Sequence, residues 1–353
     1  MTHLRKDQRG VSVDFDHAMA RGLKHMPRII AALLFIVTIS PSAFADDTIF
    51  DVPRNGALDV QIDGSAVTVF SSPGMPSTLE IRQSLGEAIF GNSIAQVAKE
   101  NSGFRVFSIS LPRGEIEKEI GPVKMPGFIM PSTVGFDGRI ENAYVSWYRQ
   151  SSYEFGDGLA GPYALPAQNI RYTLADPQPG EVTQAFPLLS ERRWWLASTS
   201  QEINGKTVIF AFAPQFERTT VSAEVGALLA ESHEGHFTTE RLTVVISHGV
   251  ARPARELKLK RPLVFGSFRI SSLLVRSTDY GDTSEIARAS DLKNSNNSGD
   301  EEEGAITVNG KFVKTHGKKR YLVYVGKDVL NNCSSITYKK PTKIIEISCL
   351  LAD

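Results

Sequence analysis

Few positions in this chain carry residue types at spacings that suit chemistry. In His233-Glu234-Gly235-His236 two imidazoles lie three residues apart, which could bring two ligands to one metal ion. A zinc site takes three or four converging ligands, and the sequence around this pair supplies no third one. We therefore interpret the segment as a polar loop and predict no metal and no cofactor. The chain also lacks a Gly-x-Ser-x-Gly nucleophile elbow and a Walker phosphate-binding loop.

The two cysteines, Cys333 and Cys349, suit a different chemistry, the formation of a disulfide. Both flank short β-prone runs, and a hairpin centred on Pro341 places them opposite each other. Opposed residues at a non-hydrogen-bonded pair have Cα atoms about 4.5 Å apart, within bridging range. We predict a disulfide, which persists in an exported protein.

The N-terminal segment also predicts export. Residues 1–28 are basic and polar, Ile29–Ile39 is an uncharged apolar run, and Ala43-Phe44-Ala45 follows. This pattern predicts a signal peptide over residues 1–45 and a periplasmic or secreted protein. The run is too short to cross a hydrocarbon core of about 30 Å as a relaxed helix. We therefore expect no membrane span after cleavage, with a short signal anchor as the alternative.

Composition and charge narrow the functional classes. Of 353 residues, 39 are basic and 39 acidic, which removes the electrostatic case for binding nucleic acid. Short alternating strands such as Leu58–Ile62 and Leu242–Ser247 dominate, and helices are predicted at Ile81–Phe90 and Ser222–Glu231. The chain is therefore predicted to be mainly β with a few short helices.

An internal repeat organises these strands. Residues 62–74 match residues 203–215 without a gap, at an offset of 141, and residues 161–165 resemble residues 326–330, at an offset of 165. An acidic loop over residues 290–304 accounts for most of the difference between the offsets. We predict a duplicated protein with an N-terminal lobe over residues 46–180 and a C-terminal lobe over residues 181–353.

The repeated unit resembles a lobe of the retropepsin-like aspartic peptidases. A strand, a turn and a second strand lead into a short loop, and a Gly-x-x-x-Leu segment follows, at residues 156–165 in one copy and 323–330 in the other. The resemblance implies two tandem β-barrel lobes of the pepsin and retropepsin type, with a peptide-binding cleft between them. The positions that carry the motifs are Pro73, Gly74, Asp157, Gly158, Gly161, Pro214, Gln215 and Gly326.

The same resemblance locates the catalytic positions. The family uses two carboxylates that share one proton, and the equivalent positions here are Ser72 and Ala213. Neither side chain can act as a general acid or base near neutral pH. Glu80 and Glu217 are the nearest carboxylates, but they follow the loops. An alternative placement takes Asp279 as the aspartate of a degenerate Asp-Thr-Gly loop.

The sequence therefore predicts an exported, aspartic-peptidase-like protein that has lost catalysis and binds extended peptide or unfolded polypeptide in its inter-lobe cleft. An active or residually active aspartyl peptidase that uses Asp279 is one alternative. A structural envelope protein with a sealed cleft is the other. The peptide ligand, the oligomeric state and the cleavage of the N-terminal segment stay open at this point.

Overall fold

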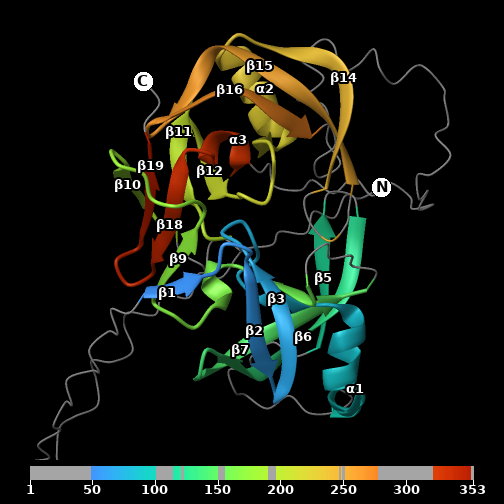
Figure 1. Ribbon diagram of the computed structural model, residues 1–353. Coiled ribbons are helices and arrows are strands. Elements are labelled where there is room, and N and C mark those ends of the chain that lie inside the picture. Colours follow the sequence, from blue (N-terminus) through green and yellow to red (C-terminus); the bar gives the residue numbers. More distant parts are fainter. Residues whose placement is uncertain are drawn as a thin grey trace, which may run out of the picture. The chain divides into compact units, whose positions relative to one another are not determined.

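A computed structural model gives the fold (Figure 1). It describes residues 49–100, 114–120, 123–149, 156–189, 196–245, 248, 251–276 and 321–350. All of them lie in one compact unit, Ala45–Asp353. The predicted signal peptide, Asp279 and the acidic loop 290–304 lie outside the described residues. Among the described residues, the structure contains no helix that combines the length and the apolar character needed to cross a membrane.

The chain is mainly β, as predicted, and its first sheet closes into a barrel. The sheet has the strand order β2-β3-β8-β4-β7-β6-β5, and β2 also pairs with β6, which closes the first six of these strands. Apolar residues alternate inward along β2, where Leu58, Val60 and Ile62 are buried. The strands are β2 (Ala57–Ile62), β3 (Ser65–Ser71), β4 (Leu79–Ile81), β5 (Gly114–Ile120), β6 (Val123–Phe136), β7 (Arg139–Tyr148) and β8 (Gly158–Ala160).

The second sheet repeats this strand order. Its strand order is β11-β12-β17-β13-β16-β15-β14, and each strand occupies the position of its equivalent in the first sheet, β11 that of β2 and β12 that of β3. Ser71 of β3 pairs with Ala160 of β8, and Phe212 of β12 pairs with Val325 of β17, so the offsets of 141 and 165 both hold in the register. The strands are β11 (Thr199–Ile203), β12 (Lys206–Phe212), β13 (Thr220–Val221), β14 (Gly235–Val245), β15 (Ala251–Phe265), β16 (Phe268–Arg276) and β17 (Leu322–Val325).

A third sheet is built from both halves of the chain. Its order is β1-β9-β18-β19-β10, and β9 and β18, which follow the last strands of the first and second sheets, pair antiparallel at its centre. The 3₁₀ helix η1 (Pro162–Ala164) precedes β9, and α3 (Lys327–Leu330) precedes β18. The strands are β1 (Ile49–Val52), β9 (Asn169–Thr173), β10 (Val182–Pro187), β18 (Cys333–Lys339) and β19 (Ile344–Cys349).

The predicted disulfide is confirmed in this third sheet. Cys333 and Cys349 pair opposite each other, with an S–S distance of 2.05 Å and a Cα–Cα distance of 3.8 Å. The turn that joins β18 and β19 leaves Lys339 opposite Ile344, which alone would place the cysteines one residue out of register. A register shift between Cys333 and Ser335 restores their opposition.

The helices begin within two residues of their predicted starts, but one is longer than expected. α1 spans Gln83–Glu100 instead of ending at Phe90, and α2 spans Ala223–Ser232. α1 packs closely against β7, because a Cβ at Gly86 would lie 2.5 Å from the ring of Trp147. Phe90 stacks on the same fully buried ring at a centroid distance of 5.2 Å. These contacts place α1 on the hydrophobic core of the first barrel.

Candidate functional site

The two loops that follow β3 and β12 are in direct contact. Ser72, the first residue after β3, donates a hydrogen bond from its Oγ to Oε1 of Gln215, at 2.6 Å. Ala213 is the first residue after β12, and a Cβ added to Gly74 would lie 2.8 Å from its Cβ. Such a distance is shorter than normal contact, so only glycine fits at position 74 without a shift. The structure thus brings the predicted equivalents of the two aspartates into one junction between the sheets.

The backbone holds both loops in the same way. Ser72 N donates to Ala160 O of β8 at 3.3 Å, and Ala213 N donates to Val325 O of β17 at 2.8 Å. Ser72 is 3% exposed and Ala213 fully buried. The two side chains at this junction are therefore a hydroxyl that is already hydrogen-bonded and a methyl group. Neither can hold or release a proton in acid–base catalysis.

A pocket of about 340 Å³ opens beside these loops. Its lining combines apolar side chains with hydroxyl, amide and cationic groups, and the described part of the chain contributes no aspartate or glutamate to it. Ser71, on its wall, donates from Oγ to Ala160 O at 2.9 Å and lies 3.1 Å from the hydroxyl of Tyr172. The lining residues are Pro53, Arg54, Gly56, Phe70, Ser71, Ser72, Pro73, Tyr172, Thr173, Leu174, Ala175, Pro214, Gln215, Lys327, Leu330, Asn331 and Cys333.

The glycines of the later motif serve close packing. A Cβ at Gly158 would lie 2.4 Å from Glu80 O, one at Gly161 would lie 2.2 Å from Met75 O, and one at Gly326 would lie 2.5 Å from the carbonyl carbon of Arg218. These glycines therefore let β8 and the segments after β8 and β17 approach the backbone that follows each loop. The structure gives them a positioning role and does not place them in the lining of the pocket.

Asp157 does not join the junction either. Its carboxylate lies 4.0 Å from Arg82 Nε, and both side chains are about half exposed. Its backbone carbonyl accepts a hydrogen bond from Arg82 N at 2.9 Å. Asp157 thus connects the start of β8 to the segment that leads into α1, at the protein surface.

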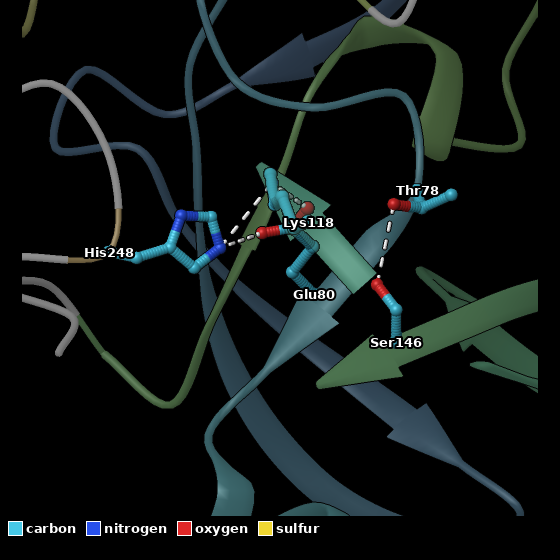
Figure 2. A network of polar contacts seen from close by, with 5 residues as sticks. All are labelled: Thr78, Glu80, Lys118, Ser146 and His248. Atoms are coloured by element: carbon cyan, nitrogen blue, oxygen red, sulfur yellow. Dashed lines mark hydrogen bonds and ion pairs between the residues drawn. The ribbon is translucent and has the colours of Figure 1, made fainter. Parts of the chain in front are cut away.

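A buried ion-pair cluster, which the sequence analysis missed, lies around Glu80 on β4 (Figure 2). Lys118 Nζ from β5 donates to Glu80 Oε1 at 2.5 Å, and His248 Nε2 lies 2.7 Å from Glu80 Oε2. The Glu80 and His248 side chains are at most 1% exposed, although 168 residues separate them in sequence. Next to them, the hydroxyls of Thr78 and Ser146 lie 3.4 Å apart. The cluster thus joins the first sheet to a residue that follows β14.

The aromatic ring of Tyr148 packs beside this cluster. Lys118 Nζ lies 5.1 Å from the centroid of the Tyr148 ring, a cation–π distance. The His248 ring meets the same tyrosine edge to face, at a centroid distance of 5.3 Å. Burial, followed by the negative charge of Glu80, raises the pKa of Tyr148, so its hydroxyl stays neutral.

The electrostatics of the cluster fix its charge state at neutral pH. Burial alone would raise the pKa of Glu80, but the charge of Lys118 and the contacts with His248 together outweigh it and lower the pKa to about 2. Burial is the largest influence on His248 and lowers its pKa, so its imidazole is neutral at pH 7. A carboxylate with so low a pKa carries no proton to donate above about pH 3. The cluster is therefore suited to holding the structure together and unsuited to general acid catalysis.

A single sequence signal pointed to this cluster. Glu80 stands between Leu79 and Ile81 in a short apolar strand, and a charged residue at such a position must find a partner when it is buried. The equivalent residue in the second copy, Val221, is apolar, so a buried carboxylate at this position occurs in the first copy alone. Glu217, the other carboxylate near a loop, is 79% exposed and pairs with Lys327 at 3.2 Å.

The remaining candidates add no reactive group. His233 Nδ1 lies 2.8 Å from Ser232 Oγ, and His236 is exposed. No three or more His, Cys, Asp or Glu side chains gather at metal-binding distances in the described part of the chain. Asp279 lies outside that part. A scan against protein-family models gives no match for this chain, and a search of curated proteins finds no significantly similar sequence.

Proposed function

We propose that this chain is an exported relative of the two-lobe, retropepsin-like aspartic peptidases that has lost catalysis and binds extended polypeptide beside its facing loops. The observation that carries the proposal is the contact of the Ser72–Gly74 loop with Ala213 and Gln215, a junction at which these described residues bring no carboxylate. The repeated strand order of the two sheets and the third sheet shared between them support the two-lobe interpretation. The disulfide fits an oxidising, exported environment.

The loss of catalysis follows from the side chains at the junction. Peptide hydrolysis in this family depends on two carboxylates that share one proton. Ser72 and Ala213 supply none, and no aspartate or glutamate of the described ranges lines the adjoining pocket. Glu80 is buried, paired with two partners and held at a pKa of about 2, so it does not replace them.

Binding of polypeptide is supported by the chemistry of the pocket. Phe70, Leu174 and Leu330 offer apolar surface to side chains, and Ser72 and Gln215 offer hydrogen-bonding groups to a backbone. A volume of about 340 Å³ is near the lower end of the range of ligand pockets. It therefore suits a short segment of a longer chain.

The experiment measures binding and cleavage in the same samples. A fluorescently labelled, permanently unfolded probe, reduced and carboxymethylated lactalbumin, is titrated with the protein, and anisotropy reports binding. Leu174→Trp places a large ring in the pocket lining and is expected to weaken binding at least tenfold. Val264→Trp is the control, because Val264 is 48% exposed on β15 and does not line the pocket.

Each outcome decides between the functions. Binding that Leu174→Trp weakens and Val264→Trp leaves intact, without cleavage of the probe between pH 3 and 7, is the expected result. Cleavage that Asp279→Asn abolishes would replace the proposal with residual peptidase activity. Absence of binding by the unmodified protein would overturn the proposal in favour of a structural role.

A further inference from the structure

The pocket beside the facing loops has an asymmetric charge. Two cations, Arg54 and Lys327, line it, and none of its described lining residues is acidic. Arg54 comes from the loop between β1 and β2, and Lys327 is the first residue of α3, so the two halves of the chain contribute one cation each. At neutral pH this lining favours an anionic ligand over a neutral or cationic one.

Arg54 is held in place while most of its donors stay available. Its Nε donates to Leu174 O at 3.0 Å, which fixes the guanidinium at the pocket. Among the described residues, the carboxylate paired with it is that of Asp176, 4.0 Å from a terminal nitrogen, which is too long for a hydrogen bond. No described residue accepts a hydrogen bond from the terminal nitrogens of Arg54. A guanidinium positioned in this way can bind a carboxylate with two parallel hydrogen bonds.

The acidic partners of both cations lie outside the pocket and in solvent. Asp176 is 89% exposed beside Arg54, and Glu217 is 79% exposed at 3.2 Å from Lys327. Exposed pairs of this kind contribute little, because water and salt screen them. Because these exposed pairs are weak, a ligand carboxylate in the pocket can compete with them for both cations.

The rest of the lining limits what the anion can be attached to. The pocket walls are partly apolar, and a bare inorganic anion would leave this apolar surface in contact with water. The apolar lining residues are Phe70, Leu174, Leu330, Pro53, Pro73 and Pro214. The pocket is also small, about 340 Å³. An apolar side chain next to a carboxylate, the arrangement at the end of a polypeptide, matches both features.

We infer that this pocket binds the free C-terminal carboxylate of a polypeptide, with Arg54 and Lys327 holding the carboxylate and the apolar walls holding the last side chain. The inference rests on the proposed function and names its ligand class. The protein then recognises the C-terminal ends of polypeptides, so an internal segment binds more weakly than a terminal segment of the same sequence.

The test compares two peptide libraries that differ only at their ends. Labelled heptapeptides with mixed sequence and an apolar last residue are prepared with a free carboxylate and as C-terminal amides, and their affinities are measured by anisotropy at low and high salt. We expect the free acids to bind at least tenfold more tightly than the amides, with a preference that shrinks as salt is added. Added acetate is expected to compete with the acids only.

Three variants assign the preference to the cations. Arg54→Gln and Lys327→Gln are each expected to reduce the acid-over-amide ratio at least threefold. Arg269→Gln is the matched control, because Arg269 is an exposed arginine on β16 that does not line the pocket. The side chains of Arg54 and Lys327 are 59% and 52% exposed, so the variants are expected to fold, which thermal melting checks.

The outcomes separate this inference from the proposed function. Equal binding of acids and amides would overturn the inference and leave the polypeptide-binding function standing. Weakening of both libraries by the same factor in Arg54→Gln would also overturn it, because the arginine would then act on the backbone. If neither library binds and the unfolded probe does not bind, both proposals fail together.

Discussion

Neutralising Glu80 is predicted to destabilise the protein strongly. In Glu80→Gln the amide keeps the size of the side chain but loses its charge, and Lys118, only 16% exposed, loses the carboxylate 2.5 Å from its Nζ. Removing one partner of a buried ion pair costs about 3–5 kcal/mol. We therefore expect the free energy of unfolding at pH 7 to fall by about that amount.

The same prediction can be made from the pKa of Glu80. The contacts with Lys118 and His248 hold it at about 2 in the folded protein, against 4.5 in a free side chain. At 1.36 kcal/mol per unit, a difference of that size corresponds to roughly 3 kcal/mol. Because the folded pKa is the lower one, this contribution is fully present well above pH 4.5. It is lost as the pH falls through 4.5 towards 2.

Urea unfolding followed by tryptophan fluorescence measures both effects, since Trp147 is buried in the first barrel. The stability difference between Glu80→Gln and the unmodified protein is expected to narrow as the pH falls from 5 towards 2. Glu234→Gln is the control, because Glu234 pairs with Lys260 at 2.7 Å but is 48% exposed, and an exposed pair contributes at most about 1 kcal/mol. A loss below 1 kcal/mol in Glu80→Gln, or a difference that does not change with pH, would refute this account of the cluster.

Three further predictions use the same unfolding assay. Gly74→Ala is expected to lower the free energy of unfolding by about 1–3 kcal/mol, because its Cβ would crowd the facing loop. Gly91→Ala is the control: nothing lies within 4 Å of its Cβ, so it should stabilise helix α1 by about 0.5–1 kcal/mol. Equal effects of the two substitutions would contradict the close approach of the loops. Burial lowers the pKa of His248, so the unfolded chain takes up its proton first and stability falls as the pH drops below 6.5. His248→Gln should remove this part of the pH dependence, and replacement of the exposed His236 by glutamine should retain it. Reduction of the disulfide, which spans 16 residues, should cost about 3 kcal/mol, and an unchanged urea midpoint in reductant would show that it does not constrain the unfolded chain.

The repeat could be predicted from the sequence because local backbone geometry fixes its turn residues. Glycines at the tight turns Gly64 and Gly205 have positive φ angles of 83° and 70°, and prolines follow the strands in both copies. Such residues are fixed by backbone geometry, so they keep their spacing when other side chains change. This is why β3 and β12, 141 residues apart, occupy equivalent positions, with Ser71 paired to Ala160 in one sheet and Phe212 to Val325 in the other.

The ion-pair cluster could not be predicted because its partners are remote in sequence. Lys118 is 38 residues from Glu80 and His248 is 168 residues away, and no local pattern links the three. The sequence placed Glu80 between two apolar residues, which favours burial, but did not indicate which residues would pair with it. The resemblance predicted that the two loops face each other, but the hydrogen bond of Ser72 with Gln215 could not be predicted from it.

The length of α1 was misjudged for a related reason. The hydrophobic pattern weakens after Phe90, which favoured an early end for the helix. In the structure the helix continues to Glu100, ten residues further. Its first half is held by tertiary packing of Gly86 and Phe90 on Trp147, and once a helix is nucleated its extension costs little. Tertiary packing therefore accounts for the helix, and the periodicity of its apolar residues was not enough to predict its length.

The first repeated sheet closes into a barrel and the second, in its described part, stays open, so the two copies depend differently on the third sheet. In the first copy β2 pairs with β6, whereas in the second the described part of β11 pairs only with β12. There, Phe186 of β10 stacks on Phe265 at 4.8 Å, and Phe265 stacks on Phe210 at 4.0 Å. An aromatic side chain from the third sheet thus covers core that the first copy covers with a strand pairing. Removal of β10 would expose this aromatic cluster, so the second copy depends on the third sheet for its core as well as for its connection to the first.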